Sequence, residues 1–511
     1  MDFQVLGEMI GFQGLNLDLM PEHLPPEDES FYLVNGNNIL IRNGKIEKLR
    51  GTDYLNGIST QRGIDGYRNI TGLAIYRKYS TGAKYLMAAA PRNLYYLKTD
   101  NQWYNLGTIT NGGNDSVFSF ANIEDRFVFT QSDSTFVWHW DTGETIAKLF
   151  APPQDDNLRA RFLLQYKTHL VLLRTIESTV EYYQRVWISD PGDIDSFPDE
   201  YKLDIDAKGV IRGGLLMENE IIVYLDDSIH RIIYGEDPTP GFYSQIIADS
   251  VGLWAARTLT GNKDVHFFLD KEGLMRFIRG DVPRSVSDRK FNKLILDEID
   301  PVYYYRAAAR FFPHLGHLFL TYPKSGSSYN DVQIIYDVKS EELISKKSLT
   351  VENYSSYGEF EKDLSTLSPD ERKSYGLCVV PIIGNKDGYI KEQKIIVYQD
   401  GVSNYESNAV AAPTFWKEKS RNKRVLQADF LIEKLTGDNI TFVLNLANEM
   451  NENYAYSYTV IGTGNAGTRR YECRDIDCFG KEFTVKIKDS NNAQGWKLHG
   501  LIFRGYYAGQ K

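Results

Sequence analysis

An apolar strand, a turn, a second apolar strand and a shorter aromatic strand recur along the middle of this chain. The copies begin near residues 72, 116, 160, 209, 257 and 303, so successive starts are 44 to 49 residues apart. A period in this range, with four short strands per repeat, is typical of a propeller blade. One blade cannot bury its apolar faces alone, so such repeats pack against one another around a ring. The period therefore predicts an all-β protein built on a six- or seven-bladed β-propeller.

The aromatic content indicates the same fold class. The chain has 34 Tyr, 26 Phe and 7 Trp, which together make 13% of its residues, and 41 Gly separate the apolar runs. Aromatic side chains suit the half-buried surface of a sheet, whereas glycine suits turns. A further strand pair at residues 375–400 is a candidate for a seventh blade.

An insertion at about residues 354–373 carries the one helical pattern in the propeller segment. Phe360, Leu364 and Leu367 are spaced at four and three residues, which is the spacing of one helix face. Ser368-Pro369 provides an N-cap followed by proline at the first helical position. We therefore expect a helical insertion before the last blade.

The segments on either side of the propeller have different patterns. Residues 1–60 contain a proline-rich and acidic stretch, and then a hairpin around Asn43-Gly44, the dipeptide that favours a type I′ turn. Beyond the propeller at 61–405, the basic stretch 406–424 is expected to be a linker. Five segments of alternating polarity over residues 425–511 predict a small antiparallel β-sandwich.

The N-terminal stretch is expected to be an extended arm. Proline removes a backbone donor and restricts φ, so dense prolines disfavour regular structure. Arms that become ordered on assembly can wrap a large surface of a neighbouring subunit. The candidate inter-subunit residues of this arm are Pro21, Glu22, Pro25, Pro26 and Glu27.

The basic stretch before the sandwich has two interpretations. It can be a solvated linker, or it can contact phosphate or an acidic surface of a neighbouring subunit, such as the arm. The candidate subunit or DNA-channel contacts are Lys417, Lys419, Arg421, Lys423 and Arg424.

The overall charge restricts the classes of partner. The chain has 58 Lys and Arg against 68 Asp and Glu, a net charge of −10. Broad binding of nucleic acid needs clustered positive charge, so it is not expected. The N-terminus lacks the basic start and apolar core of a signal peptide, which predicts synthesis and folding in the cytoplasm. Cys378, Cys473 and Cys478 are expected to be reduced thiols.

Short motifs in the chain have structural interpretations that fit better than chemical ones. Residues 462–467 (GTGNAG) match a dinucleotide fingerprint, but no helical period follows, so we expect a hairpin loop. The acidic loop at 190–200 lacks the EF-hand order and is expected to be solvated rather than to bind calcium. His314 and His317 flank a turn. No signature of a hydrolase, P-loop, metal site, sialidase, WD40 or kelch repeat occurs, so we expect neither an enzyme nor a cofactor.

Three parts of the chain resemble tail and virion proteins of tailed bacteriophages. The opening, FQGLNLDLMPEHLPPEDESFYLVNGNNILIRNGKIEKLRG, has a Gly-Leu-Asn start, a proline-rich step and a hairpin that closes in a basic-Gly pair. The middle contains VWISDPGDIDSF, GGLLMENEIIVYLDDSIHRIIYG and DVHFFLDKEGLMRFIRGD, and the ending is WKLHGLIFRGYYAG. The family resembled is the β-propeller tail-hub, nozzle and packaged-DNA-stabilisation proteins of short-tailed phages.

The resemblance implies a structural virion protein that forms an oligomeric tail ring, expected to be a hexamer, as hub, adaptor or nozzle around the DNA exit channel. The implied partners are further copies, other tail or portal and adaptor proteins, and genomic DNA passing through the lumen without sequence-specific binding. The implied location is the virion tail, assembled in the host cytoplasm, with no membrane span. A net-acidic chain limits drag on DNA, because each neutralised phosphate adds affinity through counterion release.

A second hypothesis belongs to another class of function. The protein can be a carbohydrate-binding or carbohydrate-active propeller that recognises a host surface, with a lectin-like sandwich at its C-terminal end. In that case Tyr and Trp side chains would stack on sugars, although aromatic residues in a β-rich chain also serve as core and cross-strand pairs.

Overall fold

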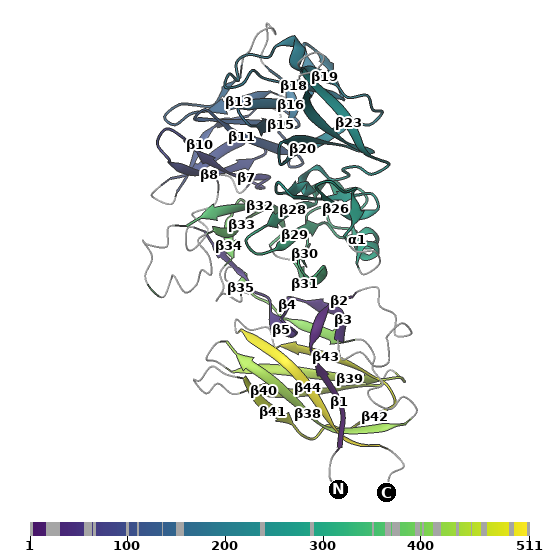
Figure 1. The fold of residues 1–511 in the computed structure, drawn as a ribbon. Coiled ribbons are helices and arrows are strands. Elements are labelled where there is room, and N and C mark those ends of the chain that lie inside the picture. The colour runs from purple at the N-terminus through teal and green to yellow at the C-terminus, as the bar shows by residue number, and fades with distance from the viewer. Residues whose placement is uncertain are drawn as a thin grey trace.

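The computed structural model of this chain is an all-β protein, which confirms the predicted fold class. A propeller and a sandwich are joined by strands from the N-terminal segment, and both termini lie at the end of the sandwich away from the propeller (Figure 1). The structure describes residues 4–507 except 17–30, 56–63, 65–67, 99–101, 110–111, 135, 150–157, 236–240, 287–290, 350–351, 363–368, 370–378, 394–398, 401–402, 412–420, 436–438, 451, 461–467 and 490–494.

Six blades are each built from strands that follow one another along the chain. In every blade the first strand lies at the end of its sheet, and these first strands begin within five residues of the six predicted repeat starts. The blades comprise β7 (Gly72–Arg77), β8 (Lys84–Ala90), β9 (Asn93–Leu97) and β10 (Trp103–Thr108); β11 (Phe118–Ile123), β12 (Arg126–Gln131), β13 (Val137–Trp140) and β14 (Ala147–Lys148); β15 (Ala160–Tyr166), β16 (His169–Glu177), β17 (Val180–Glu181), β18 (Arg185–Ile188) and β19 (Lys202–Asp204); β20 (Ile211–Met217), β21 (Glu220–Leu225), β22 (Ser228–Gly235) and β23 (Gly241–Asp249); β24 (Thr260–Gly261), β25 (Val265–Asp270), β26 (Gly273–Ile278) and β27 (Arg284–Ser285); and β28 (Ala308–Phe312), β29 (His317–Tyr322), β30 (Val332–Asp337) and β31 (Glu342–Ser348).

A seventh, mixed sheet closes the ring. Its first strand packs between the first strands of the sixth and first blades. One of its strands comes from before the propeller and pairs antiparallel with a strand from the end, with Tyr54 opposite Lys391. This pairing ties the two ends of the propeller segment together. The sheet comprises β32 (Tyr354–Glu361), β33 (Val379–Asn385), β34 (Ile390–Gln393), β6 (Thr52–Tyr54), β35 (Gln399–Asp400) and β36 (Ser403–Asn404).

The helical insertion predicted at residues 354–373 is wrong at its start, where β32 forms instead. The hydroxyls of Ser355 and Ser356 both donate to the carbonyl of Ile70, at 2.6 and 2.8 Å. These bonds hold the segment as the innermost strand of the closing sheet, and they outweigh a helical spacing that rests on three apolar residues. Leu364, Leu367 and Ser368 lie outside the described residues.

A helix that the sequence analysis missed follows the fifth blade. α1 (Asn292–Glu298) buries Ile295, and the flanking Phe291 and Ile299 are buried four residues to either side. The Asn292 side chain accepts a hydrogen bond from the backbone N–H of Leu274 at 3.1 Å. The helix is therefore docked on β26 by one apolar face and one amide.

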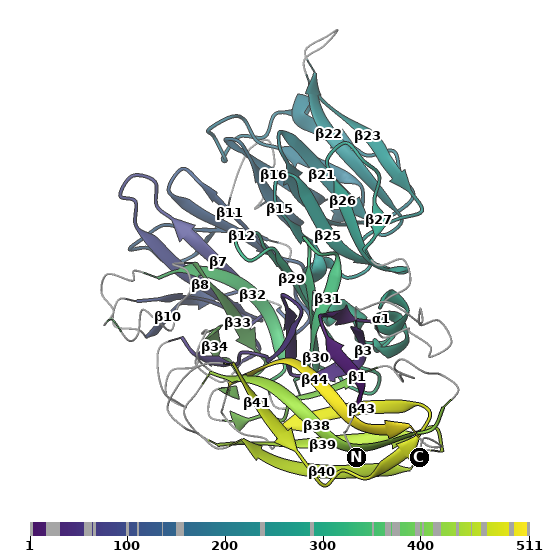
Figure 2. The ribbon, with the colours of Figure 1, turned by 60° about the horizontal axis from the view of Figure 1, so that its bottom comes forward.

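The C-terminal sandwich shows the alternation of buried and partly exposed side chains that the sequence predicts. Figure 2 shows the sandwich strands with the bottom of the view in Figure 1 turned forward. In β39, for example, Phe442, Leu444 and Leu446 are buried and the residues between them are not. One sheet contains β38 (Lys423–Lys434), β41 (Thr468–Cys473), β42 (Cys478–Gly480) and β44 (Trp496–Tyr507), and the other contains β37 (Asn408–Ala411), β39 (Ile440–Asn448), β40 (Asn453–Val460) and β43 (Phe483–Asp489).

The described N-terminal strands pair with the sandwich and the propeller rather than forming a separate region, whereas residues 17–30, which hold most of the predicted arm, lie outside the described residues. β1 (Gln4–Ile10) runs antiparallel along β44, with Gln4 opposite Gly505. The predicted hairpin forms from β4 (Ile39–Arg42) and β5 (Lys45–Lys48), and its positive φ values of 50° at Asn43 and 73° at Gly44 fit a type I′ turn. A strand partner more than 400 residues away leaves no local signal in the sequence.

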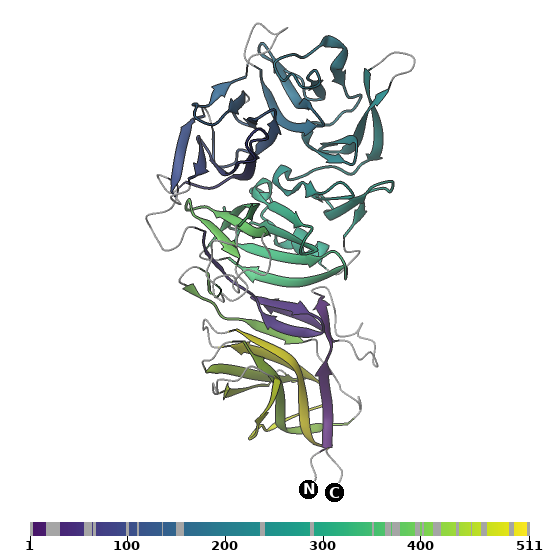
Figure 3. The same cartoon turned by 60° about the vertical axis from the view of Figure 1, so that its left-hand side comes forward.

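Two further N-terminal strands join the propeller to the sandwich. β2 (Phe12–Leu15) pairs with β31 of the sixth blade, and β3 (Phe31–Asn37) pairs with β2 and β37. A ten-stranded sheet therefore runs from the sixth blade into the sandwich (Figure 3).

A buried ion pair fixes the hairpin against the sandwich. The Lys48 ammonium lies 2.7 Å from Asp489 Oδ2, and neither side chain is exposed. Trp496 Nε1 donates to the same oxygen at 3.0 Å, and the backbone N–H of Ser407 donates to Oδ1 at 2.7 Å. Burial lowers the pKa of Lys48, while the charge of Asp489 opposes that shift. The junction thus depends on a charge pair between opposite ends of the chain.

Candidate functional site at the propeller axis

The innermost segments of all seven sheets line a cavity of about 460 Å³ on the propeller axis. Small-molecule sites have volumes of about 300 to 1,000 Å³. The cavity can therefore hold a small molecule, but not a nucleic-acid duplex, whose major groove alone is about 12 Å wide. Its polar side chains other than arginine include Ser119, Asn122, Gln165, Thr260, Ser355 and Ser356.

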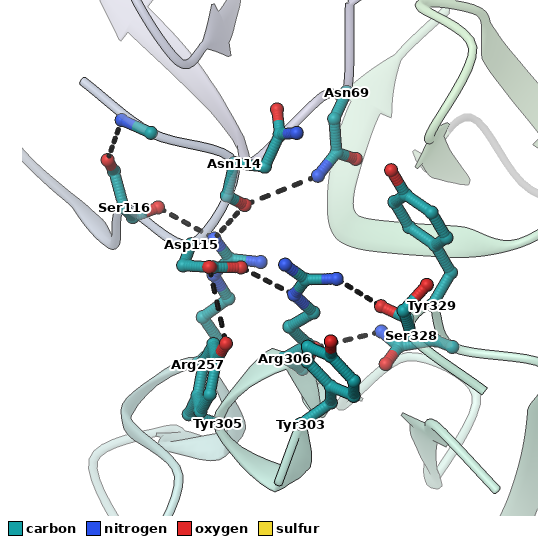
Figure 4. A network of polar contacts seen from close by, with 12 residues as sticks. Asn69, Asn114, Asp115, Ser116, Arg257, Tyr303, Tyr305, Arg306, Ser328 and Tyr329 are labelled. Atoms are coloured by element: carbon teal, nitrogen blue, oxygen red, sulfur yellow. Dashed lines mark hydrogen bonds and ion pairs between the residues drawn. The ribbon is translucent and has the colours of Figure 1, made fainter. Parts of the chain in front are cut away.

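Polar contacts cross the axis at the end of the cavity where the innermost strands begin (Figure 4). Arg257, in the single turn η3 (Ala256–Thr258) before the fifth blade, donates from Nη2 to the carbonyl oxygens of Asn114 and Ser116, at 3.1 and 2.8 Å. Asn69, before the first blade, donates to the Asn114 carbonyl at 3.4 Å. Loops before three different blades thus meet at one carbonyl group.

Another set of polar contacts across the axis joins the sixth blade to the second blade. Arg306 Nε lies 2.5 Å from Asp115 Oδ1, and the Tyr305 hydroxyl donates to the other oxygen of that carboxylate at 3.3 Å. The rings of Tyr303 and Tyr329 lie against the guanidinium of Arg306, 4.7 and 5.4 Å from its carbon. Asp115 therefore holds two blades that face each other across the ring.

Local structure places Arg306 before the sixth blade. Asp300 Oδ1 accepts the backbone N–H groups of Val302 and Tyr303, at 2.8 and 3.0 Å, and so begins the turn that leads into η4 (Tyr304–Arg306). The Tyr304 ring stacks on Trp254 with centroids 4.2 Å apart. A capped turn and a stacked ring pair thus set the direction of the arginine.

The two arginines of the network stay charged at neutral pH, and Tyr305 stays neutral. Burial lowers the pKa of Arg257 to about 10, against the charge of Asp115. Burial also acts to lower the pKa of Arg306, but Asp115 and the neighbouring tyrosines raise it overall. Burial and the Asp115 charge raise the pKa of Tyr305. Charged guanidinium groups and a neutral phenol suit binding and bracing, not proton transfer.

Sequence reasoning missed these residues, although a signal for them exists. Asn69, Asn114, Arg257 and Arg306 stand two to four residues before β7, β11, β24 and β28. Loops at this position of a repeat converge on the same face of a ring. An alignment of the repeats by their first strands would have marked these polar side chains as neighbours.

The predicted basic contacts separate into different environments. Lys423 is fully buried in β38 and donates to the carbonyls of Arg421 and Lys481 at 3.2 and 3.1 Å. Its proposed contact with DNA or a second subunit is therefore wrong, because a buried ammonium must be satisfied within its own chain. Arg424 forms two bonds of 2.6 Å with Asp477 at the surface of the same sheet.

The other predicted site residues give less information. Arg421 is exposed. The following predicted residues and segments lie outside the described residues: Lys417, Lys419, Pro21, Glu22, Pro25, Pro26, Glu27, Cys378 and the 462–467 loop.

The glycine-rich motif, the cysteines and the histidines that the sequence analysis discussed lie at strand ends, in turns or in the core. β41 begins at Thr468, directly after the glycine-rich loop, where a dinucleotide site would need a helix. Cys473 and Cys478 are buried free thiols whose pKa values are raised by burial. His314 lies in the turn between β28 and β29, and His317 begins β29.

Within the described part of the chain, no group of three or more His, Cys, Asp or Glu side chains is placed to hold a metal ion. No helix among the same residues has both the length and the apolar character needed to cross a membrane.

Comparisons with known proteins find similarity in fold alone. No family model matches the chain, and no curated protein sequence matches it. The Pan2 WD40 domain of Neurospora crassa matches with a TM-score of 0.39 and 7% identity, over 70% of this chain and 97% of that one. Virginiamycin B lyase of Staphylococcus aureus matches with a TM-score of 0.42 and 9% identity, over 65% and 97%.

Proposed function

We propose that this chain is a structural subunit of a tailed-bacteriophage tail, and that copies of it form a ring, with six-fold symmetry expected, around the DNA exit channel. The ring would act as hub, adaptor or nozzle, contact other tail or portal proteins, and help to retain or pass the genome. The proposal rests on the sequence resemblance to tail proteins and on where the residues that carry it lie.

The observation that carries the proposal is the meeting of the opening and the ending of the chain. Phe12–Leu15 and the Asn43-Gly44 hairpin belong to the opening stretch, and Trp496–Tyr507 belongs to the ending. Ile46 of the hairpin pairs with Leu498, and β1 runs along the same last strand. The opening and ending stretches that resemble tail proteins therefore form one continuous module beside the propeller. This is expected if the module is a building unit that this chain shares with tail proteins.

The propeller axis itself is not the proposed DNA channel. The cavity is too small for a duplex, and contacts of Arg257 and Arg306 cross one of its ends. In this proposal the DNA lumen lies between copies of the chain. A net charge of −10 per copy would limit the affinity of that lumen for phosphate.

Negative-stain microscopy of the purified full chain, together with antibody labelling of virions, tests this proposal. Ring-shaped particles and label at the tail are expected. A strictly monomeric protein that is absent from virions would overturn the proposal.

The basic stretch provides a sharper test of assembly. Replacing Lys417, Lys419 and Arg421 with Ser should weaken ring formation if this stretch contacts a neighbouring acidic surface. The matched control replaces the exposed Lys263, Lys271 and Lys339 on the propeller and changes the net charge equally. Equal ring formation in both variants and the unchanged protein would assign the stretch to a solvated linker.

A carbohydrate-binding role is the second candidate, because aromatic side chains gather between the third and fourth blades. The Phe242 ring lies 5.1 Å from Tyr234 and 5.3 Å from Tyr201, and Tyr234 is more than two-fifths exposed. Such rings can stack on the apolar faces of sugars. Micromolar glycan-array binding that is lost in a Tyr234→Ala variant would favour this candidate.

A further inference from the structure

Three arginines from consecutive blades line the axial cavity. Arg212 lies on β20 of the fourth blade, Arg257 in the turn before β24 of the fifth, and Arg310 on β28 of the sixth. β24 packs beside β28, and β20 packs beside the fifth blade. The three positive charges therefore come from one side of the cavity wall.

The arginines receive part of their compensating negative charge from outside the cavity lining, because the charges of Asp115 and Asp133 act on Arg257. Of the described residues that line the cavity, none is Asp or Glu. Arg212 has one carboxylate within reach, Asp226, at 3.6 Å. Arg257 uses Nη2 for two backbone carbonyls, as described above. A cluster of guanidinium groups without full charge pairing attracts an anion.

Several guanidinium donors also lack a partner. The Nε–H groups of Arg212 and Arg257 are buried and donate no hydrogen bond within the described residues. Arg310 is exposed although it lies in the middle of an innermost strand whose other residues are all buried. Arg310 is also one of the residues that line the cavity, and it makes no ion pair with any described residue.

The cavity also offers neutral hydrogen-bonding groups. Each innermost strand is the terminal strand of its sheet on the axial side, so this edge has backbone N–H and C=O groups without a strand partner. Ser119, Ser355 and Ser356 add hydroxyls to the lining. These groups can complete the coordination of a ligand that the arginines attract.

We propose that the axial cavity binds a small oxyanion, either free or as the phosphate or carboxylate group of a small molecule, through Arg212, Arg257 and Arg310. The planar guanidinium group can donate two parallel hydrogen bonds to two oxygens of a phosphate or of a carboxylate. This binding function is independent of ring assembly and goes beyond the proposed tail role.

Isothermal titration of the full chain at constant ionic strength tests the proposal, with inorganic phosphate and malonate as separate probes. Saturable binding of at least one probe is expected, and the preferred probe identifies the type of anionic group. Arg310→Gln should weaken that binding at least about tenfold, because it removes a charge-assisted contact. Arg310→Lys, which keeps the charge but not the fork, should have an intermediate effect.

The matched control is Arg284→Gln on β27, an exposed arginine on the outer strand of the fifth blade. It changes the net charge equally and should bind the probe as the unchanged protein does. Thermal unfolding of each variant confirms that it is folded. The proposal is overturned if neither probe binds the unchanged protein, if Arg310→Gln binds normally, or if both Gln variants lose affinity equally.

Discussion

The propeller and the sandwich are both made of antiparallel sheets, but they draw their strands from very different distances along the chain. Six blades use strands that are consecutive along the chain. The sandwich instead pairs Gln4 with Gly505 and Ile46 with Leu498. A long stretch of chain must close into a loop before strands from the two chain ends can pair. Such long-range pairing therefore slows folding more than the formation of local hairpins does. The difference teaches that the repeats define each blade, whereas contacts between the chain ends define how the blades are joined to the sandwich.

The largest expected effect is at the buried ion pair of the sandwich. Asp489→Asn leaves the Lys48 ammonium buried without its counter-charge, which should cost about 3 to 5 kcal/mol of unfolding free energy. Urea unfolding followed by tryptophan fluorescence measures this, since Trp496 contacts Asp489. A loss below about 1 kcal/mol would show that the ends of the chain are held together elsewhere.

Acid should weaken the propeller through one buried histidine. His266 bonds the Tyr224 hydroxyl of the neighbouring blade at 2.8 Å and the Leu216 carbonyl at 3.0 Å, and burial lowers its pKa to about 4. The unfolded chain binds this proton near pH 6.5, so the stability is full above that pH. It falls as the pH drops to about 4, by roughly 3 kcal/mol.

The difference between the unchanged protein and His266→Asn isolates this effect from other titrating groups. Unfolding free energies of both proteins at several pH values between 7 and 4 provide the measurement. Parallel pH profiles for the two proteins would refute the assignment.

Two glycine substitutions compare how far a local backbone distortion spreads in the propeller and in the sandwich. A Cβ at Gly112 would lie 1.4 Å from the Pro91 carbonyl oxygen, and one at Gly505 would lie 1.9 Å from that of Arg424. Gly112→Ala and Gly505→Ala should each cost about 1 to 3 kcal/mol, because the backbone must move.

Hydrogen exchange should then separate the two glycine variants. Gly112→Ala should expose amides in the first two blades alone. Gly505→Ala should also expose β1, at the opposite end of the chain. Equal spread in both variants would contradict the contrast between local and long-range pairing.

The smallest effect is expected at a surface pair next to the buried one. Lys488 and Glu406 lie 3.2 Å apart and are both about one-third or more exposed. Glu406→Gln should change the unfolding free energy by no more than about 1 kcal/mol, since solvent screens the pair. A loss of unfolding free energy as large as that of Asp489→Asn would mean that burial does not explain the contribution of the Lys48–Asp489 pair to stability.

The sequence predicted those features whose signal is local. The repeat starts, the Asn43-Gly44 turn and the alternation in β39 all follow from nearby residues. The local spacing predicts a helix where β32 forms, because the role of β32 as an inner strand depends on Ile70, nearly 300 residues earlier. The axial network was missed for the same reason, since Asp115 and Arg306 meet only when the ring closes.

Cryo-electron microscopy of intact virions tests the central claim most directly, because the proposed tail ring must be present there in its assembled state. We predict a ring of copies, each with a propeller and an adjoining sandwich, around a DNA lumen that lies between the copies. Tail density without this fold, or DNA density running along a propeller axis, would contradict the account.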